Sequence, residues 1–289
     1  MKPDRAILWI LFAAGLFTLL YLRCTIVNNP PKADMPVTPD REVADSFALL
    51  YPAAGDVRWD FKDNNYIATF TLPSGQACAW FGNGGEWLMS VREQPPEGLH
   101  REVASAFDGS VYAAWEIKSV NVLERLLMGD VYVLSVSENN RRADVYYSQF
   151  GDLIRVDLTG KAVHAPIDIP PEISRTVDSL FNDPEIIDLW ENDLSVNAAV
   201  LDDAAYRFVA FTAGYDWLCT LRDIAPESIP PNVRDAFDAS AYGDCIINRT
   251  QILHSPSDSM YVIHFPDHSQ RSHMMCIKTT GLLHCIISY

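Results

Sequence analysis

Residues 87–112, WLMSVREQPPEGLHREVASAFDGSVY, decide the fold because the chain contains this stretch twice. The second copy, WLCTLRDIAPESIPPNVRDAFDASAY, occupies residues 217–242. A shift from position 87 to position 217 aligns the copies without a gap, and Trp, Leu, Arg, Pro, Glu, Val, Ala, Phe, Asp, Ser and Tyr recur at matching positions. An internal duplication of this kind predicts a tandem architecture.

The spacing of apolar residues predicts helices and short strands around the first copy. Val43 and Phe47 have helical spacing, and so do Val103 and Phe107 in the repeated stretch. Alternation of apolar and polar residues, bounded by turn residues, predicts strands at 57–61, 66–72, 76–81, 87–88, 115–122, 131–136, 143–147 and 151–154.

The second copy lies in a unit with the same order of elements. Helical spacing places Ile173 and Val177 in one predicted helix, and Val233 and Phe237 in another. Strands are predicted at 206–211, 245–253, 261–265, 274–278 and 282–288. Residues 194–200 alternate only weakly, so the strand before 206 is poorly defined by the sequence.

The predicted fold class is α+β, with two tandem two-layer units. The sequence EVASAF at 102–107 repeats EVADSF at 42–47, so each unit consists of two related halves in the order α-β4-α-β4. Strands that are linked by hairpins and accompanied by few helices predict an antiparallel sheet with helices on one face. The opposite face of such a sheet is either solvated or a binding surface.

Residues 1–27 are predicted to lie outside both units, as a membrane anchor or signal segment. Lys2 and Arg5 precede the uncharged run AILWILFAAGLFTLLYL, and Arg23 follows it. As an N-terminal hydrophobic helix this run would rise about 25 Å, near the lower limit for a bilayer span. No small-x-small cleavage site follows it, so an uncleaved anchor is favoured over a lipoprotein modified at Cys24 and over a cleaved signal.

Proline-rich segments set the predicted domain boundaries. Residues 28–40 contain four prolines and no apolar periodicity, which is typical of an extended tether. Residues 159–171 contain three prolines and form the predicted linker between units. The units themselves are therefore expected at 41–158 and 172–289.

The charge of the chain excludes one class of partner. The composition is 48% hydrophobic, as in a folded protein, and 38 acidic residues against 22 basic ones give a net charge of -16. Residues 175–245 contain 14 Asp or Glu and only four Arg. Such a surface repels phosphate backbones, so nucleic acid is not an expected partner.

The cysteines suggest one covalent link. Cys276 and Cys285 flank a predicted hairpin, CIKTTGLLHC, whose register would place them opposite each other. A cross-strand disulfide is therefore predicted for an oxidising compartment, and buried free thiols are the alternative. The chain contains no CxxC motif, so a zinc ribbon has no support.

Catalytic and metal-binding signatures are scarce. The sequence contains no HExxH, GxSxG, GxxxxGK[ST] or GxGxxG motif. His264, His268 and His273 in HFPDHSQRSH could converge on a metal across a hairpin, but their spacing matches no established site. We therefore predict no metal, no cofactor and no catalytic residue.

An ordered set of short motifs resembles a known family. These motifs are Tyr51-Pro52, Val57-x-Trp59, Tyr66-x-Ala68-x-Phe70, Gly85-x-Trp87-Leu88, the helix 103–107, Tyr132-x-Leu134 and Tyr146-Tyr147-x4-Gly151-x-Leu153-Ile154. Together they resemble the PepSY-like, β-lactamase-inhibitor-like (BLIP-like) domains found especially in Bacteroides-type bacteria. The likeness covers residues 41–158 well and residues 172–287 more loosely.

The resemblance implies a helix pair on an antiparallel sheet whose other face is concave. It also implies a location in the cell envelope and no catalytic residues, and relatives by fold bind a protein through the open sheet face. Trp80 lies on the strand face opposite Ala77, Ala79 and Phe81, so Trp80, with Tyr146 nearby, is the expected anchor for a partner.

The sequence thus predicts a non-enzymatic envelope module on the periplasmic side, held at the inner membrane by its N-terminal helix. Its expected partner is an envelope protein or peptide, bound through the open sheet face, and the acidic second unit favours a basic one. Two alternatives stay open. One is an envelope hydrolase or metal-binding protein that uses the His-rich C-terminal strands, and the other is a purely structural module.

Overall fold

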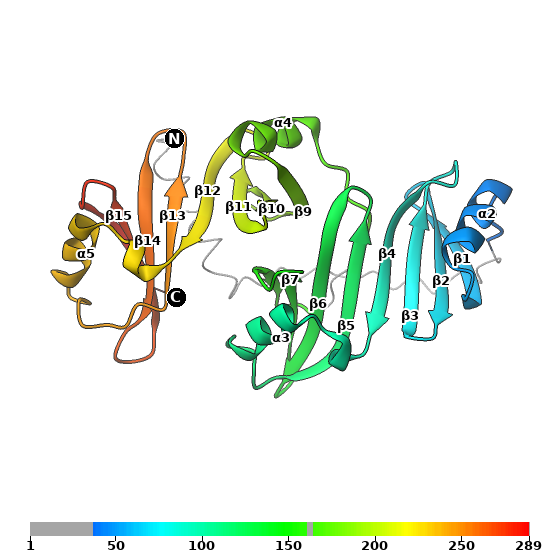
Figure 1. Cartoon of the computed structure of the whole chain (residues 1–289), viewed down its shortest axis with the longest axis horizontal. Helices are drawn as coiled ribbons and strands as arrows, with labels where there is room; N and C mark the ends of the chain where they lie inside the picture. The colour runs from blue at the N-terminus through cyan, green and yellow to red at the C-terminus, as the bar shows by residue number, and fades with distance from the viewer. Residues whose placement is uncertain (1–36, 161–163, 289) are drawn as a thin grey trace. The chain divides into compact units, whose positions relative to one another are not determined.

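A computed structural model describes residues 37–160 and 164–288. The chain divides into two compact units between Asp168 and Ile169, and each unit is described by itself (Figure 1). The predicted N-terminal helix falls outside the described residues. Within the described ranges, no helix is long and apolar enough to cross a membrane.

In the described residues, the first unit contains one eight-stranded antiparallel sheet, two α-helices and one short 3-10 helix, which confirms the predicted fold class. Its strands lie side by side in chain order, so every neighbour in the sheet is also the next strand in the sequence. The elements are α2 (Arg41–Leu50), β1 (Gly55–Lys62), β2 (Asn65–Leu72), β3 (Gly75–Phe81), β4 (Trp87–Gln94), η1 (Pro96–Gly98), α3 (Arg101–Asp108), β5 (Glu116–Arg125), β6 (Met128–Glu138), β7 (Arg141–Ser148) and β8 (Leu153–Asp157).

The second unit repeats this order of elements. Its eight strands form a second antiparallel sheet, again in chain order. The elements are α4 (Pro171–Leu180), β9 (Pro184–Glu191), β10 (Val196–Asp202), β11 (Ala205–Phe211), β12 (Trp217–Ile224), η2 (Pro226–Ser228), α5 (Pro231–Asp238), β13 (Arg249–His254), β14 (Ser259–Pro266), β15 (Ser272–Lys278) and β16 (Leu283–Ser288).

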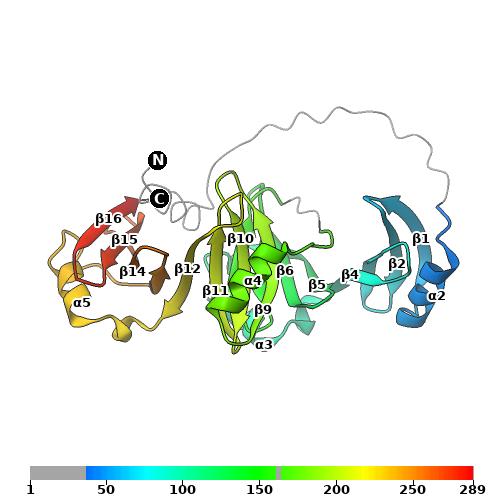
Figure 2. The ribbon, with the colours of Figure 1, turned by 90° about the horizontal axis from the view of Figure 1, so that it is seen from above.

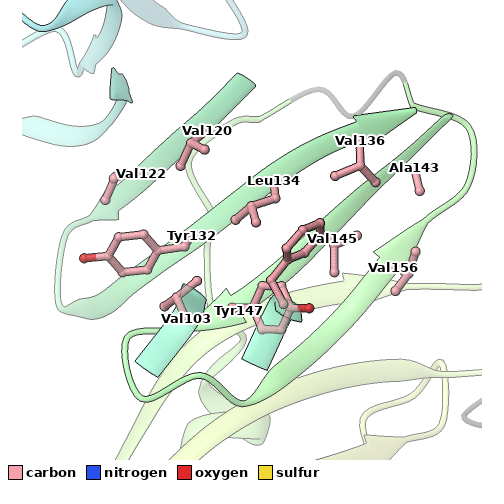
Figure 3. Packing of buried hydrophobic residues seen from close by; sticks show 11 residues of the cluster. Val103, Val120, Val122, Tyr132, Leu134, Val136, Ala143, Val145, Tyr147 and Val156 are labelled. Atoms are coloured by element: carbon pink, nitrogen blue, oxygen red, sulfur yellow. The ribbon is translucent and has the colours of Figure 1, made fainter. Parts of the chain in front are cut away.

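Each helix is held to its sheet by two side chains four residues apart. Val43 and Phe47 of α2 pack on the apolar face of β2 and β3, and Figure 2 shows α2 against the β1–β2 end of the sheet. Val103 and Phe107 of α3 pack in the same way on β5–β8, where Figure 3 shows the cluster of valines, Leu134 and Tyr147. Since residues i and i+4 share one helical face, the two positions bury together.

A turn with a left-handed residue follows the third strand of every half-repeat. Gly85, Gly151 and Gly281 have φ values of +84°, +85° and +86°. A Cβ on any of them would meet a backbone oxygen of the neighbouring helix, at 2.7 Å from Glu42 O for Gly85. The fourth such turn carries Tyr215 at φ 66°. Glycine is required where the turn touches the helix backbone this closely.

Two predicted strands differ from the structure. β10 is a full strand although its sequence alternates weakly, because its residues are buried at every position except Asp202, so neither face needs polar side chains. The strand predicted at 245–253 begins only at Arg249, and Cys245 lies in the turn before it. The N–H of Cys245 donates to Tyr242 O at 2.9 Å. This hydrogen bond closes the turn, so the Cys245 N–H does not pair with a neighbouring strand.

Candidate functional site

The sheet face of the first unit that α2 and α3 leave uncovered carries a row of side chains that is apolar in its middle and charged at both ends. Successive strands place Asp60, Ile67, Trp80, Met89 and Arg125 opposite one another in this row. Trp80 therefore lies on the face opposite Ala79 and Phe81, as predicted. We call the row and its apolar neighbours on the same face, Cys78, Val91 and Leu123, the Trp80 face.

Burial along the Trp80 face falls from the middle of the sheet toward its β1 edge. Met89 and Leu123 are buried, whereas Ile67 and Trp80 are half-buried and Asp60 is exposed. The partly accessible apolar part of this face is therefore Ile67 and Trp80, and apolar side chains next to a charged edge are the arrangement of a protein-binding surface. Ile67 and Val91 were not predicted as part of this face. The alternation of side chains along β2 and β4 would have placed both on it.

Tyr146 does not belong to an exposed anchor with Trp80. It is fully buried, and the guanidinium carbon of Arg155 lies 3.6 Å above its ring centroid. Strands β4, β5 and β6 separate its strand from that of Trp80, which corresponds to about 19 Å at the usual strand spacing. The prediction that Tyr146 lies near Trp80 is therefore wrong. Two side chains on the same sheet face are close only if their strands are also neighbours in the sheet.

A polar cluster on the helix-covered side of the same sheet was not predicted. Ser90 Oγ donates to Glu124 Oε2 at 2.7 Å, Arg92 Nε donates to the same oxygen at 3.0 Å, and Arg92 Nη2 donates to Oε1. Burial alone would raise the pKa of the Glu124 carboxyl, but the hydrogen bonds from Arg92 and Ser90 outweigh it and lower the pKa.

The second unit replaces this ion pair. Thr220 is opposite His254, as Ser90 is opposite Glu124, so His254 takes the place of the carboxylate. Burial and the positive charge of Arg222 lower the pKa of His254. Since the two units do not share this chemistry, the cluster is better explained by local packing than by a common ligand.

The histidines of the second unit lie on different faces. His264 pairs with Met274 in the ladder, whereas His273 pairs with Phe265, so the two rings point to opposite sides of the sheet. His268 lies in the exposed turn between β14 and β15, where its Nε2 is 3.1 Å from Asp244 Oδ2. A metal site made of all three histidines is therefore excluded by the alternation of side chains along β14 and β15.

His264 is a buried neutral imidazole. Its Nε2 lies 2.9 Å from Gln251 Oε1, so the ring donates to an amide oxygen. The side chain is almost fully buried, and this burial, together with the charge of Arg249, lowers the pKa of His264 to about 4. The unfolded chain, with an ordinary pKa near 6.5, therefore binds a proton at mildly acidic pH that the folded chain does not.

This difference predicts acid sensitivity of the second unit. The contribution of His264 to stability is complete above pH ~6.5 and is lost as the pH falls toward 4, by about 3 kcal/mol in total. His264→Gln keeps an amide donor near the position of Nε2 and does not titrate. We expect urea unfolding at pH 7, 5.5 and 4.5 to lose less stability in this variant than in the parent chain. Equal losses in the two proteins would refute the assignment.

His273 forms a three-residue chain of hydrogen bonds. Its Nε2 lies 3.0 Å from Asp267 Oδ2 and its Nδ1 lies 2.9 Å from Ser288 Oγ. The ring stacks on Phe265 with an interplanar angle of 15° and is buried. The bond from His273 and those from the backbone N–H groups of the turn lower the pKa of Asp267 to about 2. His273 thus lies within hydrogen-bond distance of both a carboxylate and a hydroxyl.

Cys276 and Cys285 are direct partners in the ladder of β15 and β16. In the structure both are free thiols, and the two sulfurs are hydrogen-bonded to each other. This bond and burial raise the pKa of Cys276, and the bond lowers the pKa of Cys285. Cys285 is half-buried whereas Cys276 is buried, so Cys285 is the thiol that an oxidant reaches first.

The pairing predicts that a mild disulfide oxidant links the two cysteines. Opposite residues in an antiparallel ladder have Cα separations of about 4.5–5.5 Å, within the range of disulfides. We expect oxidised glutathione to lower the intact mass by two hydrogens and peptide mapping to join β15 to β16. Cys285→Ser should abolish the link, whereas Cys78→Ser should leave it unchanged. A link between other cysteines would contradict the prediction.

Comparison with known proteins gives partial matches. A BLIP-like protein from Bacteroides fragilis is 27% identical, with a TM-score of 0.42, over 45% of this chain and 94% of that one. A DUF2874 family protein from Bacteroides ovatus is 26% identical, with a TM-score of 0.41, over 43% of this chain and 90% of that one. These two solved neighbours of the chain are thus a BLIP-like and a DUF2874 protein of Bacteroides. This agrees with the resemblance stated from the sequence.

A third solved structure, from Bacteroides eggerthii, is described provisionally as a periplasmic protein. It is 18% identical over 42% of this chain and 89% of that one, with a TM-score of 0.40. None of the three descriptions names a catalytic activity. No family model matches the chain, and no curated protein matches it.

Proposed function

We propose that the protein is a non-enzymatic binding module of the cell envelope that holds a protein or peptide on the Trp80 face. The observation that carries the proposal is the half-buried indole of Trp80 between Ile67 and Met89, on a sheet face that no helix of its unit covers. Large aromatic side chains in such positions contribute most of the binding energy at protein interfaces.

The polar edge of the Trp80 face supports recognition of a protein chain. Asp60 is exposed at the β1 end of the row, and Thr69 is exposed beside Cys78, whose sulfur lies 3.4 Å from Thr69 Oγ. A peptide across β2 and β3 would therefore meet an apolar centre and hydrogen-bonding groups at its rim. A surface with only polar side chains would instead have favoured a purely structural module.

The charge of the chain sets the kind of partner. A net charge of -16 attracts basic proteins and slows the approach of acidic ones, so the proposed partner is a basic envelope protein or peptide. The proposed location is the periplasmic side of the inner membrane, with residues 6–22 as the anchor. This places the binding units where envelope proteins are within reach.

A photocrosslinking amino acid placed at position 80 of the full chain tests the proposal in cells. We expect one discrete adduct, identified by mass spectrometry as a basic protein. The same amino acid at Leu49, an apolar residue of α2 that is 82% exposed, should give no adduct. With the partner identified, Trp80→Ala should weaken binding about 30-fold, the effect of losing a ~2 kcal/mol hot spot, and Leu49→Ala should not.

Three results would count against this proposal. No adduct at position 80 would favour the purely structural module, and an adduct to a second copy of the chain would indicate self-association instead. Binding that Trp80→Ala leaves unchanged would mean that another face binds the partner.

The second candidate function is hydrolysis, and the hydrogen-bond chain of Ser288, His273 and Asp267 supports it. A serine next to an imidazole that is oriented by a carboxylate is the arrangement of serine hydrolases. The nitrogens are exchanged relative to that arrangement, since Nδ1 faces the serine and Nε2 faces the carboxylate. Ser288 is also the ladder partner of His273, so the same contacts fasten the last strand to the sheet.

A fluorophosphonate probe separates the two roles. Labelling of Ser288 that His273→Gln abolishes would support a hydrolase. If Ser288 stays unlabelled while Ser288→Ala lowers the melting temperature, the three residues serve only to hold β16.

A further inference from the structure

Asp244, Cys245 and His268 form a compact group at one corner of the second unit, which we call the corner group. One ligand atom from each residue, a carboxylate oxygen, the thiol sulfur and an imidazole nitrogen, can be chosen so that all three lie within 4.8 Å of one another. One of these contacts joins Asp244 Oδ2 to His268 Nε2 at 3.1 Å. The three residues come from two turns that are far apart in the sequence.

We propose that the corner group binds a zinc-class divalent cation. Zinc bonds of 2.0–2.3 Å in a tetrahedral site place neighbouring ligand atoms about 3.5 Å apart, so the group needs a closure of only about 1 Å. Sulfur and imidazole nitrogen select borderline and soft metals, whereas magnesium and calcium require oxygen ligands throughout. Three protein ligands leave the fourth position for water or an incoming ligand.

Both turns that carry the corner group are fixed by their own hydrogen bonds. Gly243 N donates to Ser240 O at 3.3 Å, and a Cβ on Gly243 would lie 2.1 Å from Asp238 O, so this turn is closely packed on the end of α5. In the other turn, Asp267 Oδ1 accepts from the backbone nitrogens of Ser269 at 2.8 Å and Arg271 at 2.9 Å. Ligands on preformed turns lose little entropy when a cation binds.

The first unit fills the same corner with a different side chain. Trp115 stands at the position that corresponds to Cys245 in the duplicated sequence, and the guanidinium of Arg141 lies 4.9 Å from its ring centroid. The second unit has the small thiol of Cys245 where the first unit has this indole, and an imidazole nitrogen of His268 from the neighbouring turn lies within 4.8 Å of the Cys245 sulfur. The corner group is thus a property of the second unit alone.

Cobalt(II) titration of the reduced full chain, followed by zinc competition, tests the proposal. We expect one ion per chain at micromolar concentration, with the near-ultraviolet charge-transfer band of a cobalt–thiolate bond. Cys245→Ser should abolish this band, and His268→Ala and Asp244→Asn should each weaken zinc binding about 10–100-fold. All three side chains are on the surface or half-buried, so circular dichroism should show folded variants.

Matched controls use the same residue types elsewhere. Cys78→Ser and His100→Ala, in the first unit, should leave zinc affinity and the cobalt band unchanged. The double variant Cys276→Ser with Cys285→Ser should also keep the band. The proposal is overturned if the chain takes up no ion at micromolar concentration, or if the band persists in Cys245→Ser, which would place the metal on other thiols.

Discussion

Replacing Gly151 by alanine is expected to destabilise the first unit by about 2–5 kcal/mol. The residue has φ +85°, and its Cβ would lie 2.6 Å from Glu102 O and 3.0 Å from the carbonyl carbon of the same residue. The left-handed backbone disfavours any side chain, and the contact with α3 cannot relax without moving the helix. Urea unfolding, or hydrogen exchange of β7 and β8, measures the loss.

The chain contains its own control for this prediction. Tyr215 occupies the equivalent turn of the third half-repeat at φ 66°, with a hydrogen bond from its N–H to Thr212 O at 2.9 Å. That position already accommodates a side chain, so Tyr215→Gly should change stability by no more than about 1 kcal/mol. If Gly151→Ala were as mild as Tyr215→Gly, the close contact with α3 would not be what requires glycine.

Replacing Phe237 by alanine is expected to cost about 3–5 kcal/mol in the second unit. Its ring is fully buried and meets Phe265 edge-on, with ring centroids 5.3 Å apart and an interplanar angle of 76°. The cavity would open between α5 and the strands β14 and β15, where Ile263 and Met275 also line the cluster. Large-to-small changes in such cores lose both the transfer energy and the contacts around the cavity.

Hydrogen exchange resolves this effect by unit. We expect amides of β13–β16 to lose protection in Phe237→Ala, because α5 no longer anchors to them. Leu127→Ala serves as the control, since Leu127 is 90% exposed and its loss should change stability by less than about 0.5 kcal/mol. Unchanged protection of β14 and β15 would mean that α5 adds little to the sheet.

The fold was largely predictable because its signals are local. Val43 and Phe47, whose spacing predicts a helix, lie in α2, and each of the other three α-helices has the same spacing of two buried residues. Strand β10 was the exception, since burial on both faces removes the alternation on which strand prediction depends. Cys245 was predicted to lie in a strand because the apolar residues that follow it are typical of one. The turn at Cys245 is closed by a single backbone hydrogen bond, which the sequence pattern does not indicate.

The candidate sites were less predictable because they depend on register. Trp80 was placed on the correct face by counting along one strand, but its distance from Tyr146 depends on the number of strands between them. His273 meets Ser288 only because β15 and β16 pair in one particular register. Asp244 and His268 lie in two separate turns. Their contact depends on the conformations of both turns, which the sequence pattern does not predict.

The strand order in chain sequence has a consequence for how the protein folds. Every pair of neighbouring strands is also consecutive in the chain, and most are linked by short turns, so no contact within a sheet requires closure of a very long loop. Low contact order speeds folding, and a helix with its four strands can form as a local nucleus.

The same repetition also favours one kind of misfolding. Half-repeats of similar sequence and length can exchange strands between two molecules during folding, so domain-swapped dimers are the expected misfolded product at high concentration.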